Sequence, residues 1–180
     1  MTTYADDIRQ AAALPLPWEQ LDGCNLLVTG ATGLIGSCLV DVRMSRPDKK
    51  YRVYSAGRDE SRAQALFAAF ADDPSFHFLP CDVTRPLPSS VGFDYIVHAA
   101  SPASPRFFAQ HPVEFIQSNI LGVANLMDYG LAHGMRRLLF VSSGEVYGEG
   151  GETVFTEDCR GYGDCTSPRA CYPSSKRAAE

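Results

Sequence analysis

The chain has 180 residues, 45% of them hydrophobic, a composition typical of one compact domain rather than of a disordered or fibrous chain. Its 16 Lys and Arg against 21 Asp and Glu give a net charge of -5 without a long run of either sign, which excludes nucleic acid as an expected partner. No stretch approaches 18 consecutive apolar residues, and the start, MTTYADDIRQ, carries acids where a signal peptide needs a basic and then an apolar segment. We therefore expect no membrane partner and a cytoplasmic location.

The cysteines do not form the pattern of a metal or disulfide framework. With no export signal, the expectation is reduced thiols, and the spacing lacks the close CxxC pairs of a zinc site, so no metal is expected. The six cysteines are Cys24, Cys38, Cys81, Cys159, Cys165 and Cys171.

The predicted elements alternate between helices and short apolar strands. A polar lead with a helical pattern over residues 6–13 is followed by the turn LPLPWEQLDG, and residues 1–24 are assigned to an N-terminal helical extension. Strands that are apolar almost throughout and separated by helices require a parallel sheet covered on both faces. The predicted strands span residues 26–30, 51–56, 76–80, 94–100 and 137–143, and the predicted helices span 34–44, 62–71, 113–133 and a segment beginning at about 172.

The end of the chain carries two further expectations. The last predicted helix begins at about Tyr172 and the chain stops nine residues later, although a crossover helix should feed another strand. We therefore expect the N-terminal part of a longer polypeptide, truncated before its substrate-binding portion. The segment from Gly148 to Ala170 is too long for an ordinary connection, and such loops are often functional.

A glycine-rich turn, GATGLIG, follows the first predicted strand and opens a helix. Gly30 permits the tight turn, Gly33 lets backbone N–H groups approach a pyrophosphate, and Gly36 lets the helix pack closely on the strand. The unpaired amides at the helix start then face the two negative charges. The sequence thus predicts that residues 25–180 form an α/β, Rossmann-type, doubly wound, NAD(P)-binding domain whose turn includes Thr32, Leu34 and Ile35.

The choice between NAD and NADP depends on the end of the second strand. An acid there would bind the adenosine ribose and indicate NAD, but the strand ends Ser55-Ala56-Gly57-Arg58. Arg58 can meet a 2'-phosphate, stack on adenine or point to solvent. Asp82, after the third strand, can touch the adenine edge or cap a turn with Thr84, and both interpretations stay open.

A proton-transfer site is predicted at the last helix. Tyr172 and Lys176 are four residues apart and share one helical face. An ammonium close to a phenol favours the phenolate, which is a better proton acceptor. With Ser143, whose hydroxyl can hold a substrate oxygen at the end of the fifth strand, the pair is aimed at a hydroxyl or carbonyl group.

Four motifs together, TGATGLIG, HAAS, SSGEVYG and YPSSK, resemble the extended short-chain dehydrogenase/reductases, the nucleotide-sugar epimerases and dehydratases. The resemblance covers Asn25 to Glu180. Within the family, the run HAASPASP and the Glu of SSGEVYG are most similar to the branch that decarboxylates UDP-glucuronate. The resemblance implies Ser143, Tyr172 and Lys176 as a catalytic triad with Glu145 as a further acid or base. It also implies a cofactor lined by Gly30, Thr32, Gly33, Leu34, Ile35, Gly36, Arg58, Asp82, Val83, Ala99, Ala100, Ser101, Asn119, Tyr172 and Lys176.

Two departures from the family pattern bear on the reaction. Gly144 stands where the sugar dehydratases have an aspartate, which argues against water elimination, and Gly57 stands near the position of the NAD-selecting acid. Enzymes that oxidise and re-reduce one sugar usually retain NAD, so the resemblance implies NAD, with NADP as the alternative that Arg58 favours. Glu145 alternatively pairs with a basic residue of the loop.

The resemblance implies an NAD-dependent enzyme that acts on a nucleotide sugar through a 4-keto intermediate, as a decarboxylase or an epimerase. Two alternatives stay open: an NADP-dependent keto-sugar reductase, and a dinucleotide-binding module without turnover. A homodimer through the helices over residues 113–133 and from 172 is also implied for the full-length protein. We expect residues 1–180 alone to be catalytically weak or inactive.

Overall fold

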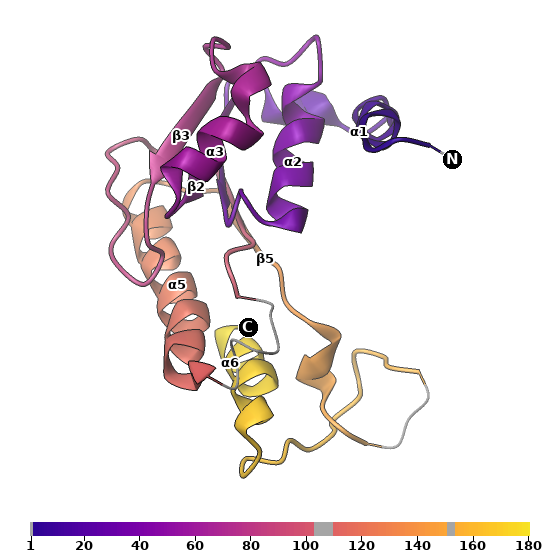
Figure 1. Cartoon of the computed structure of the whole chain (residues 1–180), viewed down its shortest axis with the longest axis vertical. Coiled ribbons are helices and arrows are strands. Elements are labelled where there is room, and N and C mark those ends of the chain that lie inside the picture. The colour runs from indigo at the N-terminus through magenta and orange to yellow at the C-terminus, as the bar shows by residue number, and fades with distance from the viewer. Residues whose placement is uncertain (1, 103–109, 151–153) are drawn as a thin grey trace.

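The computed structural model of the protein describes residues 2–102, 110–150 and 154–180. Five parallel strands form one sheet in the order β3-β2-β1-β4-β5 (Figure 1). The chain order reverses between β1 and β4, which is the switch point of a doubly wound dinucleotide-binding sheet. The predicted fold class is therefore confirmed. The strands are β1 (Asn25–Thr29), β2 (Arg52–Gly57), β3 (Phe76–Pro80), β4 (Tyr95–His98) and β5 (Arg137–Phe140).

Helices cover both faces of this sheet. In Figure 1, α2 and α3 lie on one side of it, and the long α5 lies on the other, with α6 beside α5. The α-helices are α1 (Tyr4–Ala12), α2 (Leu34–Met44), α3 (Glu60–Leu66), α5 (Pro112–Ala132) and α6 (Cys171–Ala179). Short 3-10 turns are η1 (Trp18–Leu21), η2 (Ala68–Phe70), η3 (Gly144–Tyr147) and η4 (Pro168–Ala170).

Side-chain alternation along the strands divides the interior into two cores. Val28 of β1 points into the core beneath α2 and α3, where it packs in one cluster with Val40 and Phe67. Leu27, the preceding residue, points to the opposite face, into a cluster with Ile96 and Leu126 of α5. All six side chains are at most 1% exposed. A strand buried on both faces explains why its sequence is apolar without interruption.

Several predicted boundaries are corrected. The helix predicted over residues 62–71 ends at Leu66, because Phe67 turns into the core with 1% exposure and the chain continues as the tighter turn η2. The strands predicted over 94–100 and 137–143 end at His98 and Phe140. The residues after these ends leave the ladder and carry the candidate site, so apolar composition overestimated the strand length.

The N-terminal segment packs against the outer side of α2. Thr3 and Asp6 form a capping box at the start of α1, and Ile8 is buried in a cluster with Val42 of α2. Arg46 lies 4.6 Å above the ring of Trp18, and the Tyr4 hydroxyl donates to Asp41 at 2.6 Å. Residues 2–24 are thus attached to the sheet domain through α2. No helix among the described residues combines the length and apolarity needed to cross a membrane.

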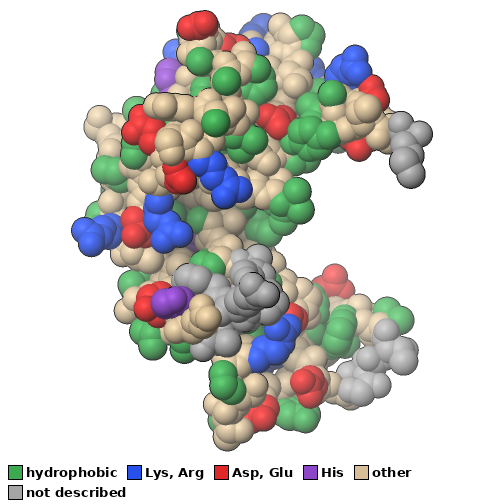
Figure 2. Space-filling view, viewed as in Figure 1, with side chains coloured by type: hydrophobic (Ala, Val, Ile, Leu, Met, Phe, Trp, Pro, Cys, Tyr) green, Lys and Arg blue, Asp and Glu red, His purple; other side chains and the backbone are tan. Residues whose placement is uncertain are grey.

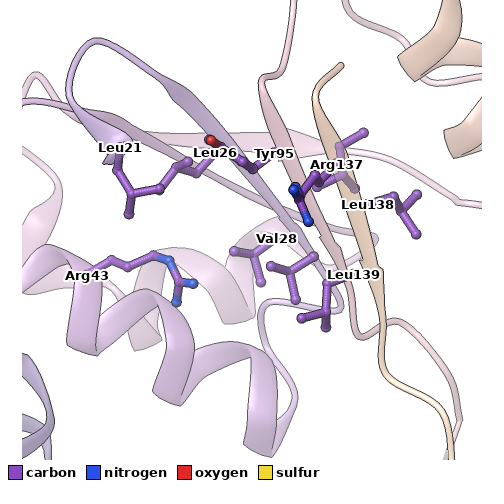
Figure 3. Close-up of a pocket in the computed structure, with 10 residues that line it drawn as sticks. Leu21, Leu26, Val28, Arg43, Tyr95, Arg137, Leu138 and Leu139 are labelled. Atoms are coloured by element: carbon purple, nitrogen blue, oxygen red, sulfur yellow. The ribbon is translucent and has the colours of Figure 1, made fainter. Parts of the chain in front are cut away.

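The sheet face beneath α2 remains open toward β5. A groove of about 380 Å³ lies there, and the guanidinium of Arg43 reaches into it from α2, toward Val28 (Figure 3). Arg43 donates to the carbonyl of Leu39, one turn back on its own helix, and burial lowers the pKa of its guanidinium. No ion pair involving Arg43 occurs among the described residues. The groove is lined by Leu21, Leu26, Val28, Arg43, Tyr95, Ile96, Val97, Arg137, Leu138 and Leu139.

Candidate functional site

The glycine-rich turn connects the end of β1 to α2 and lies against the end of β4. Gly30 has φ +66°, and a Cβ at this position would lie 2.6 Å from the Ala100 Cα. A Cβ at Gly36 would lie 2.2 Å from the Gly30 carbonyl oxygen, whereas a Cβ at Gly33 would lie 3.2 Å from the same atom. Gly30 and Gly36 therefore permit close backbone packing, as predicted, and Gly33 faces the more open side.

The start of α2 has the features of an anion site. Gly33 is its N-cap and offers no side-chain hydrogen bond to the first turn. The next two side chains, Leu34 and Ile35, are 88% and 52% exposed. First-turn amides without an internal partner favour a negatively charged ligand. Together with the close approach at Gly30 and Gly36, this cradle fits the pyrophosphate of a dinucleotide.

The end of β4 forms a second wall beside this turn. The Ala99 N–H donates to the Thr29 carbonyl at 3.2 Å, which holds the chain against β1 one residue past the strand. The Ser101 hydroxyl is buried and has no hydrogen-bond partner among the described residues. Ser101 can therefore offer a hydroxyl to a ligand at this edge. Residues 103–105 of the run HAASPASP lie outside the described residues.

Arg58 and Asp82 follow β2 and β3 at the same edge. The Asp82 carboxylate accepts from the Thr84 N–H at 3.0 Å and from its hydroxyl at 2.8 Å, so the predicted turn cap is confirmed. The Thr84 N–H holds the pKa of Asp82 below its usual range, with smaller contributions from Arg58 and Arg85. Arg58 is exposed, and the Val83 carbonyl accepts from Asn125 at 2.9 Å. Contact of Asp82 with adenine stays a prediction.

Ser143 and Glu145 lie just beyond β5. The Ser143 oxygen accepts from the Glu145 N–H at 3.2 Å and so begins η3, which leaves the hydroxyl proton able to point elsewhere. The Glu145 carboxylate pairs with Arg169 at 2.5 Å. The interpretation of Glu145 as a partner for a basic residue is thus confirmed. Arg169, three residues before Tyr172, was not predicted as a site residue from the sequence.

Lys176 is buried at the base of the site. It is 3% exposed, its Nζ donates to the Val141 carbonyl at 2.7 Å, and burial lowers its pKa to about 8. Tyr172, one turn earlier on α6, is half-buried, with its ring 5.5 Å from that of Phe115 on α5. The structure therefore places the predicted pair on one helix that packs between α5 and the end of β5.

Asn119 joins α5 to α6. It is fully buried, and its Nδ2 donates to the Ser175 hydroxyl at 3.0 Å and to the Phe115 carbonyl at 3.4 Å. Its Oδ1 has no hydrogen-bond partner among the described residues. Asn119 thus orients the helix that carries Tyr172 and Lys176, while its predicted contact with a cofactor stays a prediction.

An open pocket of about 480 Å³ lies on the other side of α6. Ser143 and Glu145 line it together with Arg169 and Arg177, whereas its described lining does not include Tyr172. Figure 2 shows a deep hollow between the part of the molecule that carries the glycine-rich turn and the part that carries α6. The described lining comprises Ser143, Gly144, Glu145, Gly148, Glu149, Phe155, Tyr162, Gly163, Asp164, Ser167, Arg169, Ala170, Pro173, Ser174 and Arg177.

The described thiols and acids do not gather into a metal site. Within residues 2–102, 110–150 and 154–180, no group of three metal-binding side chains occurs. The six cysteines, all in these ranges, are free, and Cys24, Cys81 and Cys171 are buried.

The strand order and the glycine cradle define a Rossmann-type dinucleotide-binding protein, and the Ser, Tyr and Lys side chains lie at the ligand-binding edge of its sheet. Residues 26–180 match the NAD dependent epimerase/dehydratase family, and the chain belongs to this family. The resemblance of the four sequence motifs to the nucleotide-sugar epimerases and dehydratases is confirmed.

Two curated relatives are decarboxylases. The chain is 37% identical over 156 residues to UDP-glucuronic acid decarboxylase 6 of Arabidopsis thaliana. The aligned region covers 86% of this chain and 44% of the relative. The chain is 34% identical over 165 residues to UDP-glucuronic acid decarboxylase 1 of Danio rerio, covering 90% and 37%. The chain thus spans less than half the length of these relatives.

Two solved structures share the fold. A UDP-N-acetylglucosamine 4-epimerase from Methanobrevibacter ruminantium M1, in complex with UDP-N-acetylmuramic acid, matches with a TM-score of 0.70 and 23% identity over 88% of this chain and 49% of that one. A dTDP-glucose 4,6-dehydratase from Bacillus anthracis, in complex with NAD, matches with a TM-score of 0.65 and 24% identity over 87% and 48%.

Proposed function

We propose that this chain is the cofactor-binding part of an enzyme that modifies a nucleotide sugar through a 4-keto intermediate, with decarboxylation of a UDP-glucuronate as the favoured reaction. The observation that carries the proposal is the buried Lys176 one turn after Tyr172, bonded to the Val141 carbonyl two residues before Ser143, at the edge of the sheet that also holds the glycine cradle. The relatives named as UDP-glucuronic acid decarboxylases support this substrate class.

The cofactor we propose is NAD. When bound, NAD would accept a hydride from the sugar and return it. Gly30, Gly33 and Gly36 would hold its pyrophosphate, and Thr32, Ala99, Ala100 and Ser101 would line it. An enzyme that returns the hydride to the same sugar has no need to exchange the cofactor. The exposed Arg58 keeps NADP as the alternative, and mass spectrometry of the denatured protein would identify which dinucleotide is carried.

The chain's own residues supply the proton chemistry. Tyr172 would take the proton of the sugar 4-hydroxyl, and the Lys176 ammonium would favour the phenolate that accepts it. The Ser143 hydroxyl, whose oxygen is occupied by the Glu145 N–H, would donate its proton to the substrate oxygen. Glu145 would act near the sugar as an acid or base after separating from Arg169, an ion pair exposed enough to exchange partners.

The two candidate reactions share the 4-keto intermediate and differ in the sugar that carries it. In a glucuronate, this ketone lies β to the C6 carboxylate and stabilises the carbanion that remains when carbon dioxide departs. In a neutral hexose, presenting the other face of the ketone would give the epimer. Gly144 offers no acid for water elimination, so dehydration is not proposed.

The test is turnover of UDP-glucuronate, with carbon dioxide release, by the protein extended to the length of its relatives. Tyr172→Phe should abolish turnover while NAD binding persists, because the ring still packs on Phe115. Full activity of this variant would refute the proposal. Consumption of NADPH with a keto sugar would favour the reductase, and dinucleotide binding without any turnover would favour a binding module.

We also propose a homodimer through α5. Six apolar side chains of this helix are at least 37% exposed, and five of them recur at helical spacing: Val113, Ile116, Ile120, Met127 and Leu131, with Leu121 beside them. A stripe at this spacing is the pattern by which helices pair. Ile120→Lys should shift the sedimentation equilibrium of the protein toward monomer, whereas Gln64→Lys, at an exposed position of α3, should not. An Ile120→Lys protein with unchanged mass would refute the proposed interface.

A further inference from the structure

Two aromatic rings lie in a row beneath the ammonium of Lys176. The Nζ atom is 4.5 Å from the centroid of the Phe140 ring, and this centroid is 5.6 Å from that of the His98 ring, with 31° between the ring planes. Lys176 and His98 are 3% and 1% exposed. The charge of Lys176 therefore lies on a floor of two rings, of which that of His98 is buried and that of Phe140 is half-buried.

The register of the sheet produces this row. Thr29, His98 and Phe140 are the last residues of β1, β4 and β5, and the pairings Thr29 with His98 and His98 with Phe140 place them on one rung. The rung begins one residue before Gly30, where the cradle turns away from the sheet. The same rung thus reaches from the phosphate-binding turn to the catalytic helix.

The imidazole of His98 is fixed and neutral. Its Nδ1 is hydrogen-bonded to the Thr29 hydroxyl at 2.7 Å, and its Nε2 has no hydrogen-bond partner among the described residues. A Cβ at Gly122 would lie 2.9 Å from that Nε2, so α5 confines the ring from the other side. Burial, and secondly the charge of Lys176, lower the pKa of His98 to about 4.

We propose that Phe140 and His98 are positioning residues for Lys176: the face of Phe140 and the Val141 carbonyl hold the ammonium one turn from Tyr172, and His98 supports Phe140 without a charge of its own. This proposal rests on the proposed function, in which Lys176 acts with Tyr172. Neither positioning residue is expected to touch substrate.

The electrostatic argument concerns a cation that has lost its water. Burial disfavours the ammonium, and the Val141 carbonyl accepts only one of its three N–H groups. The negative face of an aromatic ring attracts a cation, most strongly where both are desolvated. The face of Phe140 therefore stabilises the charged form of Lys176 against the effect of burial. A positive charge on His98 in the same row would destabilise that form.

The other groups around Lys176 do not replace this floor. Tyr172 lies on the same helix, and the Glu145–Arg169 pair comes from η3 and η4 with its charges joined to each other. From α5, the residues that contact α6 include Phe115 and Asn119, neither of which titrates. Burial is the cause found for the lowered pKa of Lys176.

The chain is well suited to a direct measurement, because its lysines are only Lys49, Lys50 and Lys176. NMR of the 180-residue protein with ¹³C- and ¹⁵N-labelled lysine and histidine gives one titration per side chain, assigned with Lys176→Arg and His98→Gln. In the wild type, Lys176 should titrate near its lowered pKa of about 8. His98 should stay neutral from pH 9 to about pH 5.5, a limit set by its pKa of about 4.

Variants of Phe140 distinguish the effect of its aromatic face from the effect of its size. In Phe140→Leu the pKa of Lys176 should fall by a further 0.4 to 1.5 units, roughly the shift that loss of a cation–π contact produces. Phe140→Tyr, which keeps the ring face, should stay close to the wild type. Phe140→Met replaces the ring by a flexible chain and serves as the second ringless variant if Phe140→Leu does not fold.

Three results would overturn the proposal: an unchanged Lys176 titration in a folded ringless variant, a wild-type Lys176 that titrates near 10.5, or a His98 that is charged at pH 6. All three are read without catalysis. If Tyr172→Phe is inactive but Phe140→Leu leaves the Lys176 titration unaltered, the positioning role is rejected and the proposed function is kept. If Tyr172→Phe is fully active but Phe140→Leu lowers the pKa of Lys176, the proposed function is rejected and the effect of the ring on Lys176 is kept.

Discussion

Replacing Gly36 with alanine tests the packing beneath the dinucleotide cradle. The added Cβ would lie 2.2 Å from the Gly30 carbonyl oxygen and 2.8 Å from the Ala31 Cα, well inside the 3.4 Å at which ordinary van der Waals contact begins. Both neighbours are backbone atoms, so α2 must move away from β1. Overpacking of this kind costs about 1 to 3 kcal/mol, which corresponds to a fall in Tm of roughly 3 to 10 °C.

Thermal unfolding followed by circular dichroism, and NAD titration by calorimetry, would measure the two effects of Gly36→Ala: lower stability and lost binding. Gly33→Ala should separate them, because its Cβ meets only the Gly30 oxygen at 3.2 Å, so stability changes little while the N–H groups lose their approach to the pyrophosphate. Gly92→Ala, at 3.4 Å from the nearest atom and remote from the cradle, is the control. A Gly36→Ala protein with wild-type Tm and NAD affinity would show that the cradle does not depend on this contact.

Three further predictions concern charges. In the 180-residue protein, Arg43→Met should raise the free energy of unfolding by about 1 kcal/mol, because it removes a half-buried cation without an acidic partner among the described residues. Arg52→Met, at an exposed site, should change little, and a lower stability of Arg43→Met in chemical denaturation would contradict the argument. His98 binds a proton near pH 4 when folded but near 6.5 when unfolded, so stability should fall by up to about 3 kcal/mol as pH drops through that window, and His98→Gln should flatten this part of the curve. A double-mutant cycle of Glu145→Gln and Arg169→Gln should give a coupling below about 1 kcal/mol, since both side chains are 40% or more exposed; a larger value would mean that Glu145 is not free to exchange partners.

The fold was predictable because the central strand β1 is buried on both faces. Leu26, Leu27 and Val28 are all at most 4% exposed, and such an uninterrupted apolar run between helices is compatible with few other architectures. The boundaries were less predictable. Phe67 continues a helical pattern in sequence, yet the core beneath α3 takes its side chain, and the helix ends where packing rather than propensity decides.

The site was predictable at positions where the backbone conformation or a close backbone contact requires one residue type. The positive φ of Gly30 and the close approach of Gly36 to the Gly30 carbonyl oxygen both act within seven residues of sequence. Contacts between distant segments had no such signal. Arg169 reaches Glu145 across 24 residues, and the row of Thr29, His98 and Phe140 spans more than 100, so only the strand register brings them together.

The strand register also explains why cofactor binding and proton transfer are joined in this fold. Parallel strands end at one edge, so the turn after β1 and the serine after β5 belong to the same surface even though β4 lies between them. Lys176 connects α6 to this edge, because its ammonium contacts the ring of Phe140, in the last residue pair of the sheet, and donates to the Val141 carbonyl. A shift of β4 by one residue would move His98 off the rung, turn its side chain to the other face, and displace Ala100 from Gly30. The register of β4 therefore sets both the shape of the phosphate cradle and the floor beneath the catalytic lysine.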